Sequence, residues 1–223
     1  MYTNFNFHPQ ANIPPQHVAI IPDGGRRWAR QHGISYKEAY LISMKRMVEM
    51  AKTLYQDEIK YISLFCASTQ NFLRTEEEIQ NFYEAEFLGV KEILGPFAAY
   101  NHIDLNIVGK FDGRYRMPER NPEFMQSEKK LYICFNYNSL DEIETAVERK
   151  KHKEESFVNY LEIPHPVDIL IRTGGAQTLS GFMLPQLAFA RLFFLDKLFN
   201  DLTAQEVRDI VGVYREYGLK YGE

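Results

Sequence analysis

The chain has 223 residues, a formal net charge of -4 at pH 7, 45% hydrophobic residues and 2 cysteines. This length suits one domain with a full core better than two small domains. The acidic balance and the lack of a long basic stripe exclude a general nucleic-acid binder, and no run approaches the roughly 18 apolar residues of a membrane span.

Cys66 and Cys134 lie inside apolar runs and lack the spacing of a metal site. Residues 1–16 are polar, contain several prolines and lack the apolar core of a signal peptide. We therefore expect buried, reduced cysteines in a cytoplasmic protein without integral membrane contact. The predicted organisation is an irregular lead-in over 1–16, followed by a single domain over 17–223.

Short apolar runs, each followed by a turn or a polar segment, predict the strands. They cover 17–22, 60–66, 103–108, 131–137, 167–172 and 192–194. Apolar residues at 3.6-residue spacing and two capping boxes, at 75–78 and 203–206, predict the helices. These cover 36–55, 75–94, 141–151, 157–161, 183–190 and 203–217. The alternation predicts an α/β fold with a mostly parallel central sheet flanked by helices.

The first strand runs directly into a turn that carries charged residues. Asp23, Gly24 and Gly25 follow Pro22, and the glycines allow a tight turn whose N–H groups can face an anion. Three arginines suited to phosphate oxygens come next, and these are Arg26, Arg27 and Arg30. The carboxylate of Asp23 is suited to recruit Mg²⁺. Taken alone, the segment also fits a plain turn followed by an exposed basic helix.

The fifth strand repeats this pattern. It ends at Arg172, which is followed by Thr173, two glycines and then Ser180. On its own this segment also fits a turn whose arginine pairs with an acid. Ligands of parallel sheets bind at the carboxyl ends of the strands, so two such loops together predict a site for two phosphate groups. A polar loop at 68–74, beginning with Ser68, supports this interpretation.

Four motifs together resemble the cis-prenyltransferase family, whose best-known member is undecaprenyl diphosphate synthase. They are His-Val-Ala-Ile-Ile-x-Asp-Gly at 17–24, Arg-Trp-Ala at 27–29, Ser-Thr-x-Asn-x-x-Arg at 68–74 and Ile-Arg-Thr-Gly-Gly at 171–175. The likeness spans about 17–222. It implies a homodimer with a parallel sheet, helices on its flanks and an apolar tunnel above the diphosphate sites.

The resemblance also implies roles for single residues at the first diphosphate. Asp23 would recruit Mg²⁺ and aid departure of the allylic diphosphate, which Gly24 and Arg27 would cradle. Trp28 would pack nearby. Asn71 and Arg74 would assist ionisation and closure over the substrate.

For the second substrate, the resemblance implies that Arg172 and Ser180 hold its diphosphate. Lys220, within a basic-x-Gly element at 220–222, would reach the site of the partner subunit.

Departures from the family pattern gather at the second diphosphate. Thr178 replaces a second arginine, Arg191 replaces a magnesium-binding glutamate, and Tyr40 and Tyr36 replace a histidine and an arginine. Repulsion between Arg191 and a divalent cation should disturb the usual metal geometry. Either Arg191 neutralises a diphosphate directly, or it points elsewhere.

A rebuilt second site favours a different second substrate. We expect irregular head-to-middle coupling of two dimethylallyl diphosphates to a branched or cyclic C10 diphosphate, as in lavandulyl and cyclolavandulyl diphosphate synthases. Phe82, Tyr83 and Phe87 on the presumed tunnel helix would favour a short product, although this spacing also fits plain core. The alternatives are ordinary short-chain elongation with isopentenyl diphosphate, or a non-catalytic partner subunit.

Overall fold

The computed structural model describes residues 14–68, 76–110, 119–151 and 154–217. Its centre is a six-stranded sheet in the order β3-β4-β2-β1-β5-β6, and every neighbouring pair is parallel. The strands are β1 (His17–Ile21), β2 (Tyr61–Phe65), β3 (Asp104–Val108), β4 (Lys130–Cys134), β5 (Ile169–Arg172) and β6 (Arg191–Phe194). The predicted α/β class and parallel sheet are thus confirmed, and the strand ends shift by one to three residues.

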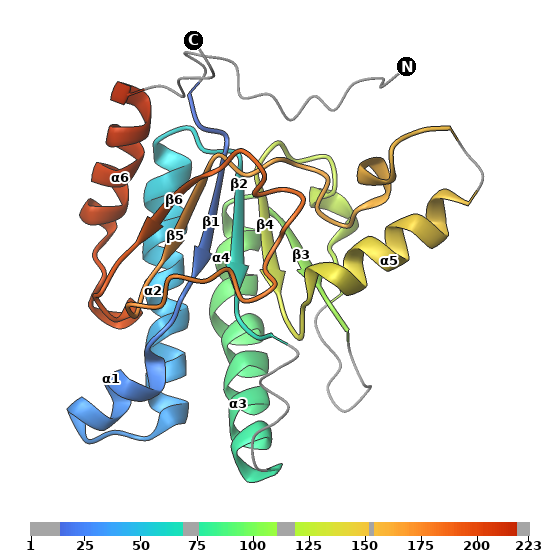
Figure 1. Cartoon of the computed structure of the whole chain (residues 1–223). Helices are drawn as coiled ribbons and strands as arrows, with labels where there is room; N and C mark the ends of the chain where they lie inside the picture. Colours follow the sequence, from blue (N-terminus) through green and yellow to red (C-terminus); the bar gives the residue numbers. More distant parts are fainter. Residues whose placement is uncertain (1–13, 69–75, 111–118, 152–153, 218–223) are drawn as a thin grey trace.

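Figure 1 shows helices beside and below this sheet. The α-helices are α1 (Gly25–His32), α2 (Tyr36–Gln56), α3 (Glu76–Gly89), α4 (Gly95–Tyr100), α5 (Ser139–Lys150) and α6 (Ala204–Tyr217). A π-helical turn, Val90–Leu94, joins α3 to α4 without a break. Short 3-10 turns lie at Pro122–Phe124, Phe157–Tyr160 and Phe199–Asp201. The capping box before α6 is confirmed, because Thr203 Oγ1 accepts from Glu206 N at 3.2 Å and Glu206 Oε2 accepts from Thr203 N at 2.9 Å.

The helix expected over 183–190 does not form. Pro185 has no N–H to donate, and Met183 has a φ of 43°, which no right-handed helix can contain. The segment instead forms turns in which Met183, Gln186 and Leu187 are buried, and the Gln186 carbonyl ties it to the chain before β5 by accepting from Val167 N at 2.9 Å. It therefore covers the sheet as irregular chain.

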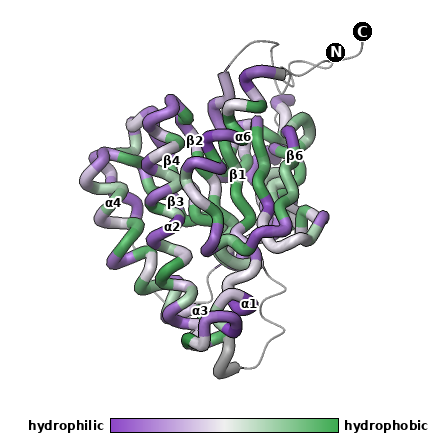
Figure 2. The backbone as a smooth tube through the Cα atoms, turned by 90° about the vertical axis from the view of Figure 1, so that its left-hand side faces the viewer, coloured by the Kyte–Doolittle hydropathy of each residue, from purple (hydrophilic) through white to green (hydrophobic). Residues whose placement is uncertain are grey.

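The two faces of the sheet are covered differently. Val18 and Ile20 of β1 face a core with α2, the π-turn and α6, whereas Ala19 and Ile21 face a core with Phe182 and neighbouring loop residues. The inner strands β1, β2, β4 and β5 are thus buried on both sides, and β1 is largely green in Figure 2, whereas the edge strands β3 and β6 are more exposed. Within the part of the chain described, no helix is long and apolar enough to cross a bilayer.

A buried ion cluster lies at the amino end of β3. Asp104 is 1% exposed and accepts from Arg120 Nε at 2.7 Å and from Lys130 Nζ at 2.8 Å. Burial by itself would raise the pKa of Asp104, but the hydrogen bonds from Arg120 and Lys130 outweigh it and lower the pKa.

We expect Asp104→Asn to lower the free energy of unfolding by about 2–3 kcal/mol at pH 7, because it leaves two cations near a neutral amide. A carboxyl with a lowered folded pKa stabilises above its unfolded pKa of about 3.9 and loses this contribution as pH falls through the folded value. The difference from wild type should therefore shrink below about pH 4. Urea unfolding against pH measures it. Glu49→Gln, which breaks an exposed pair with Arg46, should change stability by less than about 0.5 kcal/mol.

Candidate active site

A cleft of about 660 Å³ opens at the carboxyl ends of β1, β2 and β5, where α1, α2 and α3 meet the sheet. One part of its lining is polar and mostly cationic, and includes Asp23, Arg26, Arg27, Arg30, Arg172 and Ser180. The other part is apolar, and includes Ile21, Tyr40, Phe65, Cys66, Ala67 and Phe82. Such a lining suits an amphiphile with an anionic head and a hydrocarbon chain.

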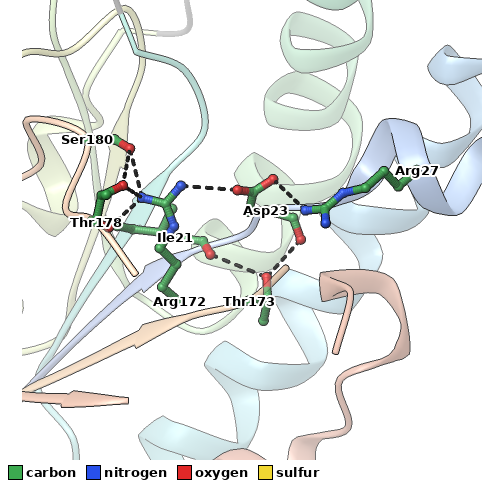
Figure 3. A network of polar contacts seen from close by, with 7 residues as sticks. All are labelled: Ile21, Asp23, Arg27, Arg172, Thr173, Thr178 and Ser180. Atoms are coloured by element: carbon green, nitrogen blue, oxygen red, sulfur yellow. Dashed lines mark hydrogen bonds and ion pairs between the residues drawn. The ribbon is translucent and has the colours of Figure 1, made fainter. Parts of the chain in front are cut away.

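Asp23 lies between arginines from both loops (Figure 3). Its Oδ1 accepts from Arg27 Nη2 at 3.3 Å, and its Oδ2 accepts from Arg172 Nη2 at 3.1 Å. The prediction that the two strand-end loops face one another is therefore confirmed. Three charged groups converge where an anion could replace the carboxylate as the partner of either arginine.

Arg172 is the buried member of this network, with 7% of its surface exposed. Its Nη1 donates to Ser180 Oγ at 2.7 Å, to Thr178 Oγ1 at 3.1 Å and to the Thr178 carbonyl. Its Nε is buried and has no hydrogen-bond partner among the described residues. Thr178, in the place of an arginine, thus orients Arg172 and does not line the cleft itself.

Two glycines make this convergence sterically feasible. Gly174 has a φ of 82°, and a Cβ there would lie 2.4 Å from Arg27 Nη2 and 3.1 Å from Asp23 Cβ. Gly24 has a φ of 110°, and a Cβ there would lie 2.7 Å from Leu198 Cδ2. Thr173 completes the turn because its Oγ1 donates to the Asp23 carbonyl at 2.9 Å. Gly174 therefore lets the second loop lie close to Asp23 and Arg27, and Gly24 lets the first loop lie close to Leu198.

Helix α1 presents the first-loop residues in two directions. Gly24, Gly25 and Arg26 line the cleft together with Arg27. Trp28 points elsewhere: its Nε1 donates to Asp201 Oδ1 at 2.7 Å, and its ring stacks on His32 with 3.9 Å between centroids. Trp28 thus fastens α1 to the 3-10 turn before α6, which agrees with packing rather than substrate contact.

Arg191 does not join the cleft. It begins β6 and pairs in register with Ile169, whereas Arg172, three residues along β5, pairs with Phe194. Its Nη1 donates to the Val213 carbonyl at 3.3 Å, and its guanidinium lies 5.6 Å from the Tyr214 ring centroid. This corrects the expectation that Arg191 helps to bind a diphosphate here, because the residue is at the amino end of its strand.

The remaining predicted residues divide between two groups. Ser68 lines the cleft directly after β2. Of the aromatic residues expected in the tunnel, Phe82 lines the cleft, Tyr83 is buried behind it, and Phe87 is half-buried away from the lining. Asn71, Arg74 and Lys220 lie outside the described residues.

The sequence interpretation missed a polar pair behind the apolar part of the cleft. Cys66 was expected in the core but is only half-buried and lines the cleft, whereas Cys134 is buried as expected. Glu86 of α3, 4% exposed, shares a hydrogen bond with the Cys66 thiol. Burial raises the pKa of Glu86 to about 8, and the bond from Cys66 only partly offsets this. The available signal was an acid one helical turn after Phe82 on a buried stripe.

Asp23 offers oxygen ligands for a metal ion, with about a third of its side chain exposed (36%) to the cleft. The described residues hold no group of three or more acidic, histidine or cysteine side chains placed to bind a metal. Mg²⁺ is often bound by a single carboxylate together with substrate phosphates and water. Asp23 therefore fits a metal that binds with a diphosphate, and not a site built by the protein alone.

Comparisons with known proteins agree with this site. Residues 21–222 match the family model described as putative undecaprenyl diphosphate synthase. An isoprenyl transferase of Campylobacter jejuni (strain RM1221) is 31% identical over 220 residues, covering 93% of this chain and 98% of the relative. One from Treponema denticola is also 31% identical, over 222 residues, covering 93% of this chain and 97% of the relative.

Two solved structures share the fold. Lavandulyl diphosphate synthase from Lavandula x intermedia, in complex with dimethylallyl diphosphate, has a TM-score of 0.77 at 24% identity and covers 94% of this chain and 98% of its own. A probable undecaprenyl diphosphate synthase from Campylobacter jejuni has a TM-score of 0.74 at 24% identity, covering 94% and 99%. With a family model matched over nearly its whole length, the chain belongs to the undecaprenyl diphosphate synthase family of prenyltransferases.

Proposed function

We propose that this prenyltransferase joins two short allylic diphosphates, coupling dimethylallyl diphosphate head-to-middle with a second copy to give a branched or cyclic C10 diphosphate. The observation that carries the proposal is Asp23, which bonds at 3.1–3.3 Å to one arginine from each strand-end loop. Two anion-binding loops in contact can bring two diphosphate esters together.

The allylic diphosphate would bind at the first loop. Arg27, with Arg26 and the turn at Gly24, would stabilise the charge that develops on the leaving diphosphate. Asp23 would hold Mg²⁺, which when bound neutralises diphosphate oxygens and eases departure of the leaving group. The predicted roles of Asn71 and Arg74 in ionisation belong to the same step.

The second substrate would bind at the other loop. Arg172 is held in place by Thr178 and Ser180, and its Nη2, which donates to Asp23 at the cleft, could donate to a phosphate oxygen instead. Only one arginine serves this loop, whereas three line the cleft from the first. The alkene of the bound ester would attack the allylic carbon, and loss of a proton would complete the reaction.

Incubation with dimethylallyl diphosphate as the sole prenyl substrate tests the proposal. We expect a C10 diphosphate, detected by mass spectrometry as the C10 alcohol after dephosphorylation, with Mg²⁺ required. No product unless isopentenyl diphosphate is added would contradict it. Linear products under that condition would support ordinary short-chain elongation, the second candidate, which the names of the isoprenyl transferase relatives favour.

We also propose a homodimer formed through the edge of the sheet at β6. Large apolar side chains there and nearby are 39–42% exposed, and these are Leu184, Phe189, Leu192 and Val213. An uncovered group of this kind is typical of protein–protein contacts. Light scattering should give twice the chain mass, and a monomer would contradict the proposal.

The two unpaired thiols suit a reducing compartment, so we expect the protein in the cytoplasm.

A further inference from the structure

A carboxyl group that pairs with no cation of the described residues is buried beside the cleft. Glu86 is 4% exposed, and among the described residues it forms no ion pair. Its Oε2 is buried and has no hydrogen-bond partner in the described part of the chain, and the carboxyl group has the Cys66 thiol as its polar contact. Unpaired acids are rarely buried, because desolvation is costly, so one next to a cleft needs an explanation.

The pair reaches the cleft through Cys66. The thiol lines the cleft, and the backbone is fixed because Cys66 N donates to the Cys134 carbonyl at 2.9 Å. Glu86 lies one helical turn beyond Phe82, which also lines the cleft, so both project from the same side of α3. The carboxyl therefore lies behind the thiol, away from water.

The register of the sheet brings this thiol near the reacting end. Ile20 of β1 pairs with Leu64 of β2, so the same register continued places Cys66 opposite Pro22, the residue before Asp23. Neighbouring strands are about 5 Å apart, so the thiol is about one strand spacing from the first anion-binding loop. A prenyl chain bound with its diphosphate at that loop would pass the thiol with its first few carbons.

We propose that Cys66 and Glu86 form a relay that takes up the proton lost during prenyl transfer. This inference rests on the proposed function. The C–H bond beside the cationic carbon breaks, and its electrons form the new carbon–carbon double bond. The proton binds to a lone pair of Cys66 Sγ while the S–H proton moves to the Glu86 carboxylate. The thiol is restored, Glu86 becomes neutral, and its proton returns to water after the product leaves.

The surroundings of Glu86 suit an acceptor that works near neutral pH. Among the described residues, the titratable group that acts on Glu86 is the Cys66 thiol, which in turn interacts with the thiol of Cys134. Burial raises the pKa of Glu86 to about 8, and the hydrogen bond from Cys66 offsets only part of this increase. A base is most effective when its pKa lies near the working pH.

The test compares pH profiles of product formation. In the wild type the rate should rise as pH increases through about 8, since Glu86 must be ionised to accept a proton. Glu86→Gln keeps the size and shape of the side chain but cannot accept the proton. It should be slower about 10²-fold at pH 8.5, lack the rise, and approach the wild-type rate near pH 6. Cys66→Ser should keep the relay, and Cys66→Ala should behave like Glu86→Gln.

Controls separate this role from a merely structural one. Glu84→Gln removes an exposed acid two residues away on the same helix, and its profile should match the wild type. The affinity of Glu86→Gln for dimethylallyl diphosphate should be unchanged, because the head group binds at the first loop. In infrared spectra, the wild type should show the band of a protonated carboxyl group that disappears as pH rises through about 8. Glu86→Gln should lack this band.

The outcomes distinguish the two proposals. If the wild type forms product and Glu86→Gln has the same rate and profile, the relay is wrong and the proposed function stands. A wild-type chain that forms no product from prenyl diphosphates would overturn both.

Discussion

Replacing Asp23 by asparagine should lower kcat for prenyl transfer about 10³-fold, equivalent to about 4 kcal/mol of transition-state stabilisation. The substitution keeps the size of the side chain but removes the charge that bonds both arginines and that would hold Mg²⁺. Release of diphosphate from dimethylallyl diphosphate, followed over a single turnover, measures the step directly.

Stability should change little in this variant. Asp23 is partly exposed, and ion pairs in such positions contribute about 1 kcal/mol or less. Asp209→Asn, on the surface of α6, removes a carboxylate whose partner is Gln205 and should retain wild-type kinetics. Full activity of Asp23→Asn would remove the basis for placing ionisation at this loop, and would revive the alternative of a non-catalytic partner subunit.

Arg172→Gln should lower kcat/KM for the second substrate by about 10³-fold. Arg172 is the cation that β5 contributes to the cleft, and Thr178, Ser180 and Asp23 hold it in one orientation. Removing a charge-assisted, oriented donor from a buried anion site costs several kcal/mol. The loss should fall on KM for the acceptor more than on ionisation of the allylic ester. The two effects are separated by measuring how C10 formation depends on dimethylallyl diphosphate concentration and, independently, the release of diphosphate over a single turnover.

Arg149→Gln is the matched control, because Arg149 is an exposed arginine of α5 that pairs with Glu162. Arg191→Gln is the informative comparison. Its position at the amino end of β6 implies a loss at least tenfold smaller than that of Arg172→Gln. Equal losses in the two variants would mean that Arg191 reaches a diphosphate after all.

Much of the fold was accessible from the sequence because its signals are local. The β-branched run that predicts β1 is ended by Pro22 and Asp23. The observed strand ends at Ile21, one residue before the predicted end at Pro22. The capping box at Thr203 and Glu206 marks the start of α6 both in the sequence prediction and in the structure. Convergence of Asp23 with Arg172 followed from the rule that parallel strands present their carboxyl ends at one edge.

The errors have physical causes. Over 183–190, apolar spacing suggested a helix, but Pro185 and the left-handed Met183 prevent it, and burial against the sheet produces the same pattern in irregular chain. For Arg191, which departs from the family pattern, its charge left open a role at a diphosphate or a position elsewhere, and strand polarity places the first residue of β6 at the opposite end from the cleft. Glu86 was missed because apolar periodicity does not register one acid within a buried stripe.

The π-turn at Val90–Leu94 has a consequence for how this long helical segment can vary. Each π-turn adds one residue to the helical repeat, so the segment before it is rotated by roughly 100° relative to an uninterrupted helix. Phe82 therefore lines the cleft, with Glu86 buried behind it, while Leu94 at the end of the turn and Ala98 beyond it pack into the main core. Substitutions in α3 can therefore change the shape of the cleft while α4 stays packed in the main core. This makes α3 a suitable place to engineer substrate specificity.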